Sequence, residues 1–128
     1  MASVVAAAKG KGEGCAAVLS GRRETSSVYE DWPVDACDRI EGAVGGSFEG
    51  LVINARLECY VNEAGMVDQL PQNEAAAYAL EHLGVRIPSP GLVWGPLAIL
   101  FRWRADFLAF KERWFDLYQR NELPEEDE

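Results

Sequence analysis

Large apolar side chains recur on one face of a helix near the end of this chain. Consecutive members of the set are four, three, four and three residues apart: Trp103, Phe107, Phe110, Trp114 and Leu117. This spacing follows the periodicity of an α-helix and does not fit the alternation of a strand. The sequence therefore predicts a C-terminal aromatic amphipathic helix within residues 102–121, and its apolar face has to be covered by something.

The middle of the chain changes to the pattern of strands. Apolar residues approximate an alternation through residues 48–61, and Asn54-Ala55-Arg56 interrupts them as a tight connection. Residues 15–20 and 91–101 are short apolar runs that also predict strands, the second with a kink, bulge or edge position at Gly95-Pro96. Residues 66–70 read as briefly extended. The polar stretch 21–33 reads as a connection. Because the strands in 48–61 alternate, we expect one wet face and helices mainly on the other side.

Two further helices are expected before the aromatic one. Residues 33–45 carry apolar side chains at helical spacing, and Gly45-Gly46 supplies a stop. Asn73 stands where a helix N-cap belongs, before the alanine-rich residues 74–84. The fold class predicted is α+β: a small antiparallel or mixed sheet of three to five strands with about three helices. Residues 15–121 form a single domain, between a flexible arm at 1–14 and an acidic tail at 122–128.

The charge balance narrows the classes of partner. The net charge is −9 at pH 7, which disfavours direct binding of nucleic acid or of an anionic membrane surface. It permits a basic protein partner, or it serves solubility alone. No apolar run approaches the roughly 20 residues that a membrane span needs. Three cysteines, an odd number, favour reduced thiols in an intracellular compartment, so we expect a cytoplasmic protein. The small, mildly basic residues at the start also resemble the stub of an organelle-targeting peptide.

The sequence offers no catalytic, cofactor-binding or metal-binding motif. Three cysteines without a CxxC pair and a single histidine, His82, do not make a zinc site. Cys37 and Cys59 read as small core residues, and the carboxylates of Asp35, Asp38 and Glu41 as a solvated helix face. The expectation is a protein without a cofactor that is not an enzyme.

Four short motifs in the central block occur in a familiar order. They are Val44-Gly45-Gly46 with Glu49, Asn62-Glu63-Ala64-Gly65, Leu70-Pro71-Gln72-Asn73, and the apolar run Gly91 to Leu100. Residues 35–100 thereby resemble the family catalogued as domain of unknown function 3846, whose members occur in phages, bacteria, and algae with their viruses. The resemblance implies an α+β fold and implies no reaction. The arm before it and the aromatic helix after it depart from the family pattern.

Two sets of residues are candidates for function. The aromatic helix could cover a sheet face, or could bind a protein partner or a second copy through Trp103, Phe107, Phe110, Trp114 and Tyr118. Asn62, Glu63 and Asn73 could line a ligand cleft, but turn and capping chemistry also explain them. The leading hypothesis is a small, acidic, non-catalytic interaction or regulatory protein. The alternative is a small-ligand binder or minor enzyme that uses the Asn62/Glu63/Asn73 region.

Overall fold

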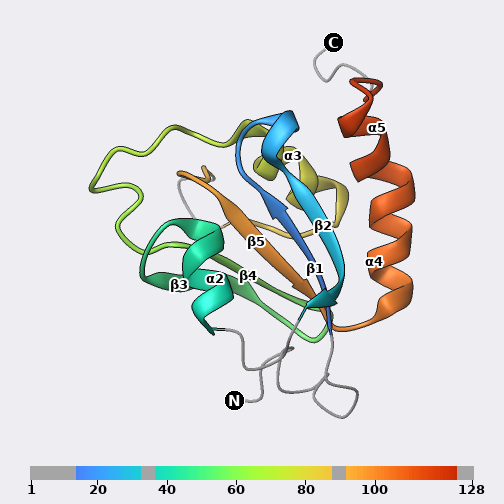
Figure 1. Ribbon diagram of the computed structural model, residues 1–128, viewed down its shortest axis with the longest axis horizontal. Coiled ribbons are helices and arrows are strands. Elements are labelled where there is room, and N and C mark those ends of the chain that lie inside the picture. The colour runs from blue at the N-terminus through green and yellow to red at the C-terminus, as the bar shows by residue number, and fades with distance from the viewer. Residues whose placement is uncertain (1–13, 33–36, 88–91, 124–128) are drawn as a thin grey trace.

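The computed structural model describes residues 14–32, 37–87 and 92–123 (Figure 1). Strands and helices follow one another in a mixed order in this part of the chain. They are β1 (Gly14–Leu19), η2 (Arg23–Thr25), β2 (Ser27–Trp32), α2 (Cys37–Val44), β3 (Phe48–Ile53), β4 (Leu57–Asn62), α3 (Glu74–His82), β5 (Leu97–Phe101), α4 (Arg104–Phe110), η3 (Lys111–Phe115) and α5 (Asp116–Gln119). The predicted arm at 1–14 and the acidic tail lie almost wholly outside the described residues.

The described strands form one antiparallel sheet in the order β2-β1-β5-β4-β3. β5 is the central strand: Phe101 pairs with Cys15 of β1 on one side and with Leu57 of β4 on the other. The hairpins β1–β2 and β3–β4 complete the two halves of the sheet. The predicted α+β class, with a small sheet and a C-terminal aromatic helix, is confirmed.

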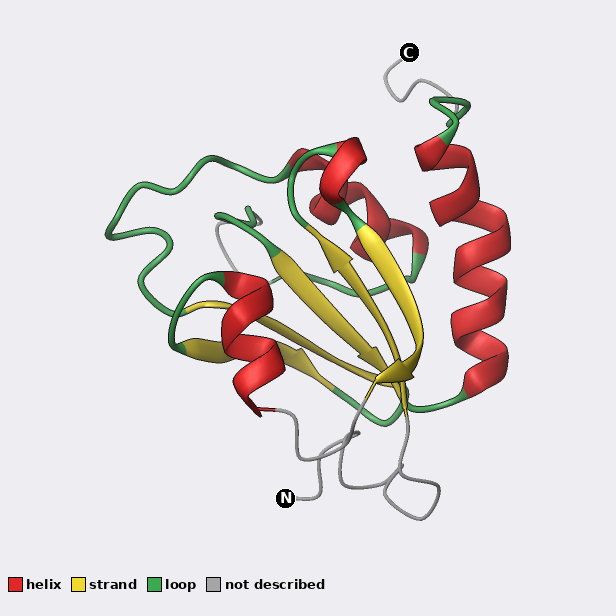
Figure 2. Cartoon of the chain, in the orientation of Figure 1, coloured by secondary structure: helices red, strands yellow, loops and turns green. Residues whose placement is uncertain are grey.

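Two of the three predicted helices, α3 and the C-terminal helix, lie on one side of the sheet, as expected, and α2 lies on the other. The expected wet face is wrong, because the central strands are covered on both faces. Odd-numbered positions of the central strands, such as Ala17 and Ile99, pack against α3 and the C-terminal helix. Even-numbered positions, such as Val18 and Leu100, pack on the other face with Ile40 of α2. Figure 2 shows α2 crossing in front of the sheet while α3 lies behind it. Both faces of β1 and β5 are therefore buried from solvent.

The C-terminal helix runs through α4, η3 and α5, and η3 is a π-helical turn. Its aromatic side chains belong to the core: Phe107, Phe110 and Trp114 are 0%, 1% and 4% exposed. The ring of Phe101 in β5 lies 5.7 Å from that of Phe107 and 5.5 Å from that of Phe110. Burial of each such side chain stabilises the fold by roughly 1.5–3 kcal/mol, so this helix is an integral part of the domain.

Three local predictions are wrong. The polar residues expected to be a connection include a strand, β2, because an edge strand is specified by pairing with β1 and needs few apolar side chains. Residues 66–70 belong to a run of turns and not to an extended segment. The strand expected at 91–101 is wrong in its bounds: the regular strand begins only at Leu97, although the interruption at Gly95-Pro96 was expected. Before it, Trp94 forms an isolated bridge with Gln72.

Other local predictions are confirmed. The connection at Asn54 is a tight turn in which its side chain accepts hydrogen bonds from the backbone of Arg56 and Leu57. α2 ends at Val44, and the N–H groups of Gly45 and Gly46 both bond to the carbonyl of Glu41. Cys59 is fully buried in the core, as expected.

Candidate functional site

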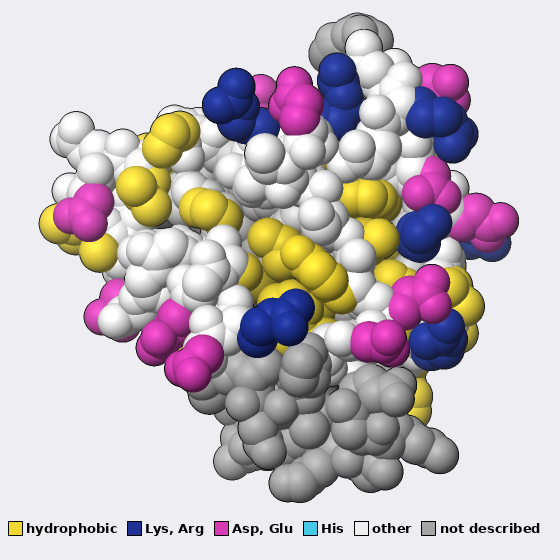
Figure 3. Space-filling model, in the orientation of Figure 1, with side chains coloured by type: hydrophobic (Ala, Val, Ile, Leu, Met, Phe, Trp, Pro, Cys, Tyr) yellow, Lys and Arg dark blue, Asp and Glu magenta, His cyan; other side chains and the backbone are white. Residues whose placement is uncertain are grey.

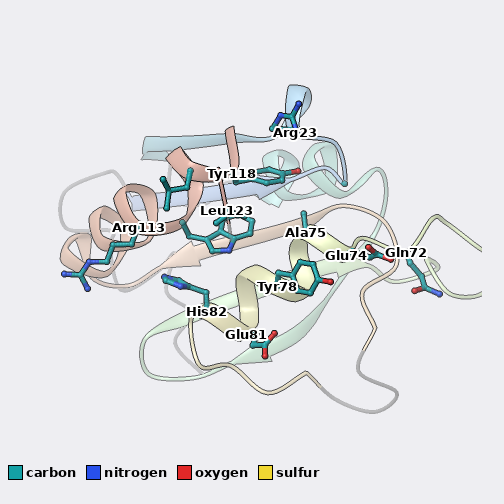
Figure 4. Close-up of a pocket in the computed structure, with 13 residues that line it drawn as sticks. Arg23, Gln72, Glu74, Ala75, Tyr78, Glu81, His82, Arg113, Tyr118 and Leu123 are labelled. Atoms are coloured by element: carbon teal, nitrogen blue, oxygen red, sulfur yellow. The ribbon is translucent and has the colours of Figure 1, made fainter. Parts of the chain in front are cut away.

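A groove of about 860 Å³, here called the helix groove, opens between α3 and the C-terminal helix (Figure 4). The loop between β1 and β2 closes one side of it. The lining residues are Gly21, Arg23, Gln72, Glu74, Ala75, Tyr78, Glu81, His82, Arg113, Trp114, Leu117, Tyr118 and Leu123. Its volume falls within the range of sites that hold small molecules or peptide side chains.

Aromatic side chains form the wall that the C-terminal helix contributes. The ring of Trp114 stacks on Phe110 at 5.4 Å and on Tyr118 at 4.9 Å, with interplanar angles of 14° and 24°. Phe110 and Trp114 are buried, whereas Tyr118 is half-buried at the end of the stack. Tyr78, 43% exposed, projects from α3 on the opposite wall. The groove thus has a firm aromatic base with an accessible ring on each side.

The π-helical turn lies in the wall that carries this stack. A π turn contains more residues than an α turn, and it allows both Trp114 and its neighbour Phe115 to be buried. Single π turns within α-helices occur frequently at functional sites. The turn also carries Arg113 at the end of the groove where His82 lies (Figure 4).

Charges of both signs border the groove. Arg23 lies beyond Tyr118, and Glu74 lies at the end opposite Arg113 (Figure 4). Within residues 14–32, 37–87 and 92–123, neither Arg23 nor Arg113 belongs to an ion pair, because the pairs formed there use Arg56, Arg104, Lys111 and Arg120. The two guanidinium groups are therefore available to carboxylates of a ligand.

His82 is the imidazole of the groove. Partial burial lowers its pKa below the ordinary value of 6.5, and the positive charge of Arg113 lowers the pKa further. From α3, the imidazole ring of His82 faces the aromatic wall, with its centre 6.2 Å from the ring centre of Phe110. His82 is neutral at pH 7 as a result, and it adds no positive charge to the groove.

The loop that carries Arg23 is tied to the C-terminal helix. The side-chain amide of Gln119 donates to the backbone carbonyls of Arg23 and Ser26, at 2.9 and 3.2 Å. Within the loop, the hydroxyl of Ser26 donates to the carbonyl of Arg22 and accepts from the N–H of Ser20. These bonds hold the rim of the groove in place without a ligand.

The aromatic residues predicted for interaction divide among three environments. Trp114 and Tyr118 line the helix groove. Phe107 and Phe110 are buried against the sheet. Trp103 is 55% exposed before the start of α4, with the guanidinium of Arg102 5.5 Å from its ring centre. Only part of the predicted stripe is thus accessible to a partner.

The structure does not bring Asn73 together with Asn62 and Glu63. Asn73 is 2% exposed; its side chain accepts from the N–H of Ala76, which confirms the predicted N-cap, and donates to the carbonyls of Leu19 and Gly95. Asn62 donates to the carbonyl of Val44 and accepts from the N–H of Ala64. Both amides are thus engaged with the backbone.

Asn62 and the exposed Glu63 border a second, smaller cavity of about 350 Å³ beside β3. Most of its wall is apolar and comes from the ends of β3 and β4 and from two loops: Glu49, Gly50, Leu51, Val61, Met66, Val67, Leu92, Val93 and Trp94 complete the lining. We call it the edge cavity.

The sequence patterns do not indicate several of the residues that line the groove. Tyr78 and Glu81 occupy the polar side of α3, where helical spacing indicates nothing beyond a solvated face. Arg113 lies between apolar members of the stripe, and Arg23 lies in a loop far away in the sequence. No local pattern marks such residues, because only the packing of α3 against the C-terminal helix brings them together.

Cys15 and Cys59, the cysteines whose side chains the structure describes, are not activated as nucleophiles. Burial raises the pKa of Cys59 to about 12, with a further increase from the neighbouring carboxylate of Glu58. Burial also raises the pKa of Cys15, although Arg104 opposes the increase. A thiol with a raised pKa stays protonated near neutral pH and reacts slowly.

Among the residues that the structure describes, no three His, Cys, Asp or Glu side chains lie close enough together to hold a metal ion. No helix in the same residues is both long and apolar enough to cross a membrane. No family model, curated protein or solved structure matches this chain. The resemblance of residues 35–100 to the family of unknown function stays a prediction.

Proposed function

We propose that this protein is a non-catalytic interaction domain that binds a short segment of a protein partner in the helix groove. The observation that carries the proposal is the accessible pair Tyr118 and Tyr78, which face the groove from opposite walls above a buried aromatic stack. Tyrosine, tryptophan and arginine dominate the binding energy of protein interfaces. All three residue types line this groove.

The arrangement of charges indicates the chemistry of the segment. An apolar or aromatic side chain fits between the two tyrosines, and a carboxylate on either side of it fits Arg23 or Arg113. The carboxylates of Glu74 and Glu81 disfavour a strongly acidic segment, so we expect one of mixed charge. The rim is already fixed by Gln119, which lowers the ordering cost of binding.

The test is selection of peptides from a random displayed library on the immobilised protein. We expect enriched peptides to carry an aromatic or large aliphatic residue near a carboxylate. In a nuclear magnetic resonance titration they should shift the amides of α3 and of residues 111–119. Tyr78→Ala should weaken their binding about tenfold, since truncating an interface anchor costs more than about 1 kcal/mol.

Leu108→Ala is the matched control. Leu108 is 41% exposed, close to the value for Tyr78, but it is not among the groove residues. This variant should bind the selected peptides like the parent protein. The proposal fails if no peptide is enriched, or if the amide shifts of bound peptides lie away from the groove.

A further inference from the structure

β3 forms one edge of the described sheet, and its register determines which backbone groups are free. The N–H of Glu63 bonds to the carbonyl of Ser47, and that of Asn54 to the carbonyl of Leu57. The pairs Phe48↔Asn62 and Ile53↔Glu58 are therefore of the non-hydrogen-bonded type. The register shifts at a bulge between Gly50 and Val52. Phe48 and Gly50 before the bulge, and Ile53 after it, therefore direct their N–H and C=O groups away from β4, where an added strand could bond to them.

The edge cavity lies against one face of this strand. Leu51 of β3 and Val61 of β4 contribute to its wall, beneath the turns that carry Met66 and Val67. Met66 is 58% exposed and Val67 is 81% exposed, which is unusual for apolar side chains that lie together. A strand added to β3 would place every second side chain beside this apolar wall.

The surroundings of β3 are acidic. Glu49 on the strand and Glu63 on the rim of the cavity are both exposed. Arg56 is the only Lys or Arg between residues 40 and 85, and it pairs with Asp106 of the C-terminal helix. Figure 3 shows several acidic side chains toward the left edge of the molecule. Arg39 of α2 is a cation of the same region, but its guanidinium lies over the rings of Tyr29 and Trp32 of β2.

The charge decides which occupant fits. A second copy paired through its own β3 would bring the acidic edges of two chains together, and like charges on facing strands destabilise pairing. A basic segment has the opposite relation to Glu49 and Glu63. We propose that β3 accepts an extended, basic segment of a protein partner as an additional strand, with apolar side chains entering the edge cavity.

This surface is separate from the helix groove, so the inference stands or falls independently of the function proposed above. Ile53 of β3 tests it well, because its side chain lines neither cavity and is 39% exposed. Ile53→Pro removes an outward N–H, which an edge strand tolerates. Ile53→Ala removes the same side chain and keeps the N–H.

The probes are two short capped peptides, one of alternating lysine and valine, the other of alternating glutamate and valine. We expect only the lysine peptide to bind and to slow hydrogen exchange at the amides of Phe48, Gly50 and Ile53. Added salt should weaken the binding. Ile53→Pro should bind roughly 3- to 10-fold more weakly than Ile53→Ala, the loss expected for one hydrogen bond. Glu49→Lys should reverse the preference between the peptides.

Three results would overturn the inference. One is equal binding of both peptides, and another is protection of amides elsewhere than on β3. The third is a dimer of the parent protein in light scattering that Ile53→Pro dissociates, because the edge would then belong to a second copy. Circular dichroism of each variant controls for loss of the fold, and the exposed Glu49→Lys variant tests the charge relation even if Ile53→Pro does not fold.

Discussion

The rings of Trp114 and Tyr118 stack at 4.9 Å, and through them the buried core extends to the surface of the helix groove. Trp114 is 4% exposed and also stacks on Phe110, whereas Tyr118 is half-buried. The two aromatic residues therefore lie in different environments: the ring of Trp114 is part of the core, and the ring of Tyr118 is partly accessible from the groove.

Trp114→Ala should lower the free energy of unfolding by about 3–5 kcal/mol, because it leaves a cavity between the helix and the sheet. Tyr118→Ala should cost clearly less, since its ring is partly in water already. Urea denaturation followed by circular dichroism measures both. A Trp114→Ala loss as small as that of the exposed control Leu108→Ala would contradict the assignment of Trp114 to the core.

Asn73→Ala should be strongly destabilising for its size. The change removes the cap of α3, which costs about 1 kcal/mol, and leaves the carbonyls of Leu19 and Gly95 without their buried donor. We expect a total loss of about 2–4 kcal/mol. Asn73→Ser keeps an oxygen that can accept from Ala76 but lacks the amide donors, so its loss should be intermediate. Chemical denaturation of the three proteins gives the order.

Stability should depend on the protonation of His82. Its pKa in the folded protein is below the ordinary 6.5, because of burial and Arg113, so the unfolded chain binds a proton first as the pH falls. The free energy of unfolding should therefore be at its full value above about pH 7.5. It should decline as the pH falls through 6.5 toward the pKa of the folded state.

His82→Gln should remove this part of the pH dependence, because a glutamine side chain does not titrate. Denaturation of both proteins across this pH range makes the comparison. Equal pH profiles of the variant and the parent would exclude a shifted pKa at His82.

Cys59 should resist alkylation in the folded protein. Its side chain is fully buried and its pKa is raised to about 12, so little thiolate forms near pH 8. We expect iodoacetamide to modify it at least about a hundredfold more slowly than in urea. Mass spectrometry of the peptide that contains Cys59 measures the rate, and similar rates in both conditions would show that β4 is open to solvent.

The sequence predicted the elements whose local pattern is strong. Helical spacing of the aromatic stripe located the C-terminal helix, and the asparagine before an alanine run located the start of α3. β2 was missed because its residues are mostly polar and half-exposed, and pairing with β1 decides its structure. The runs in β1 and β5 have no alternation, which is typical of strands covered on both faces.

The candidate site was predicted only in part. Trp114 and Tyr118 stood out through the stripe, but Tyr78, Arg23 and Arg113 have no local signature. Their convergence depends on how two helices and a loop pack around the sheet. Sequence spacing also cannot distinguish aromatic side chains that cover a sheet from those that meet a partner, since both need the same helical face.

The position of β5 has a consequence for the order in which the molecule assembles. The hairpins β1–β2 and β3–β4 can each close locally, but they share no pairing until Leu97–Phe101 lies between them. During synthesis, β1 cannot pair with β5 until most of the chain has left the ribosome. Long-range closure of this kind slows folding, and until β5 is in place the apolar faces of both hairpins stay exposed.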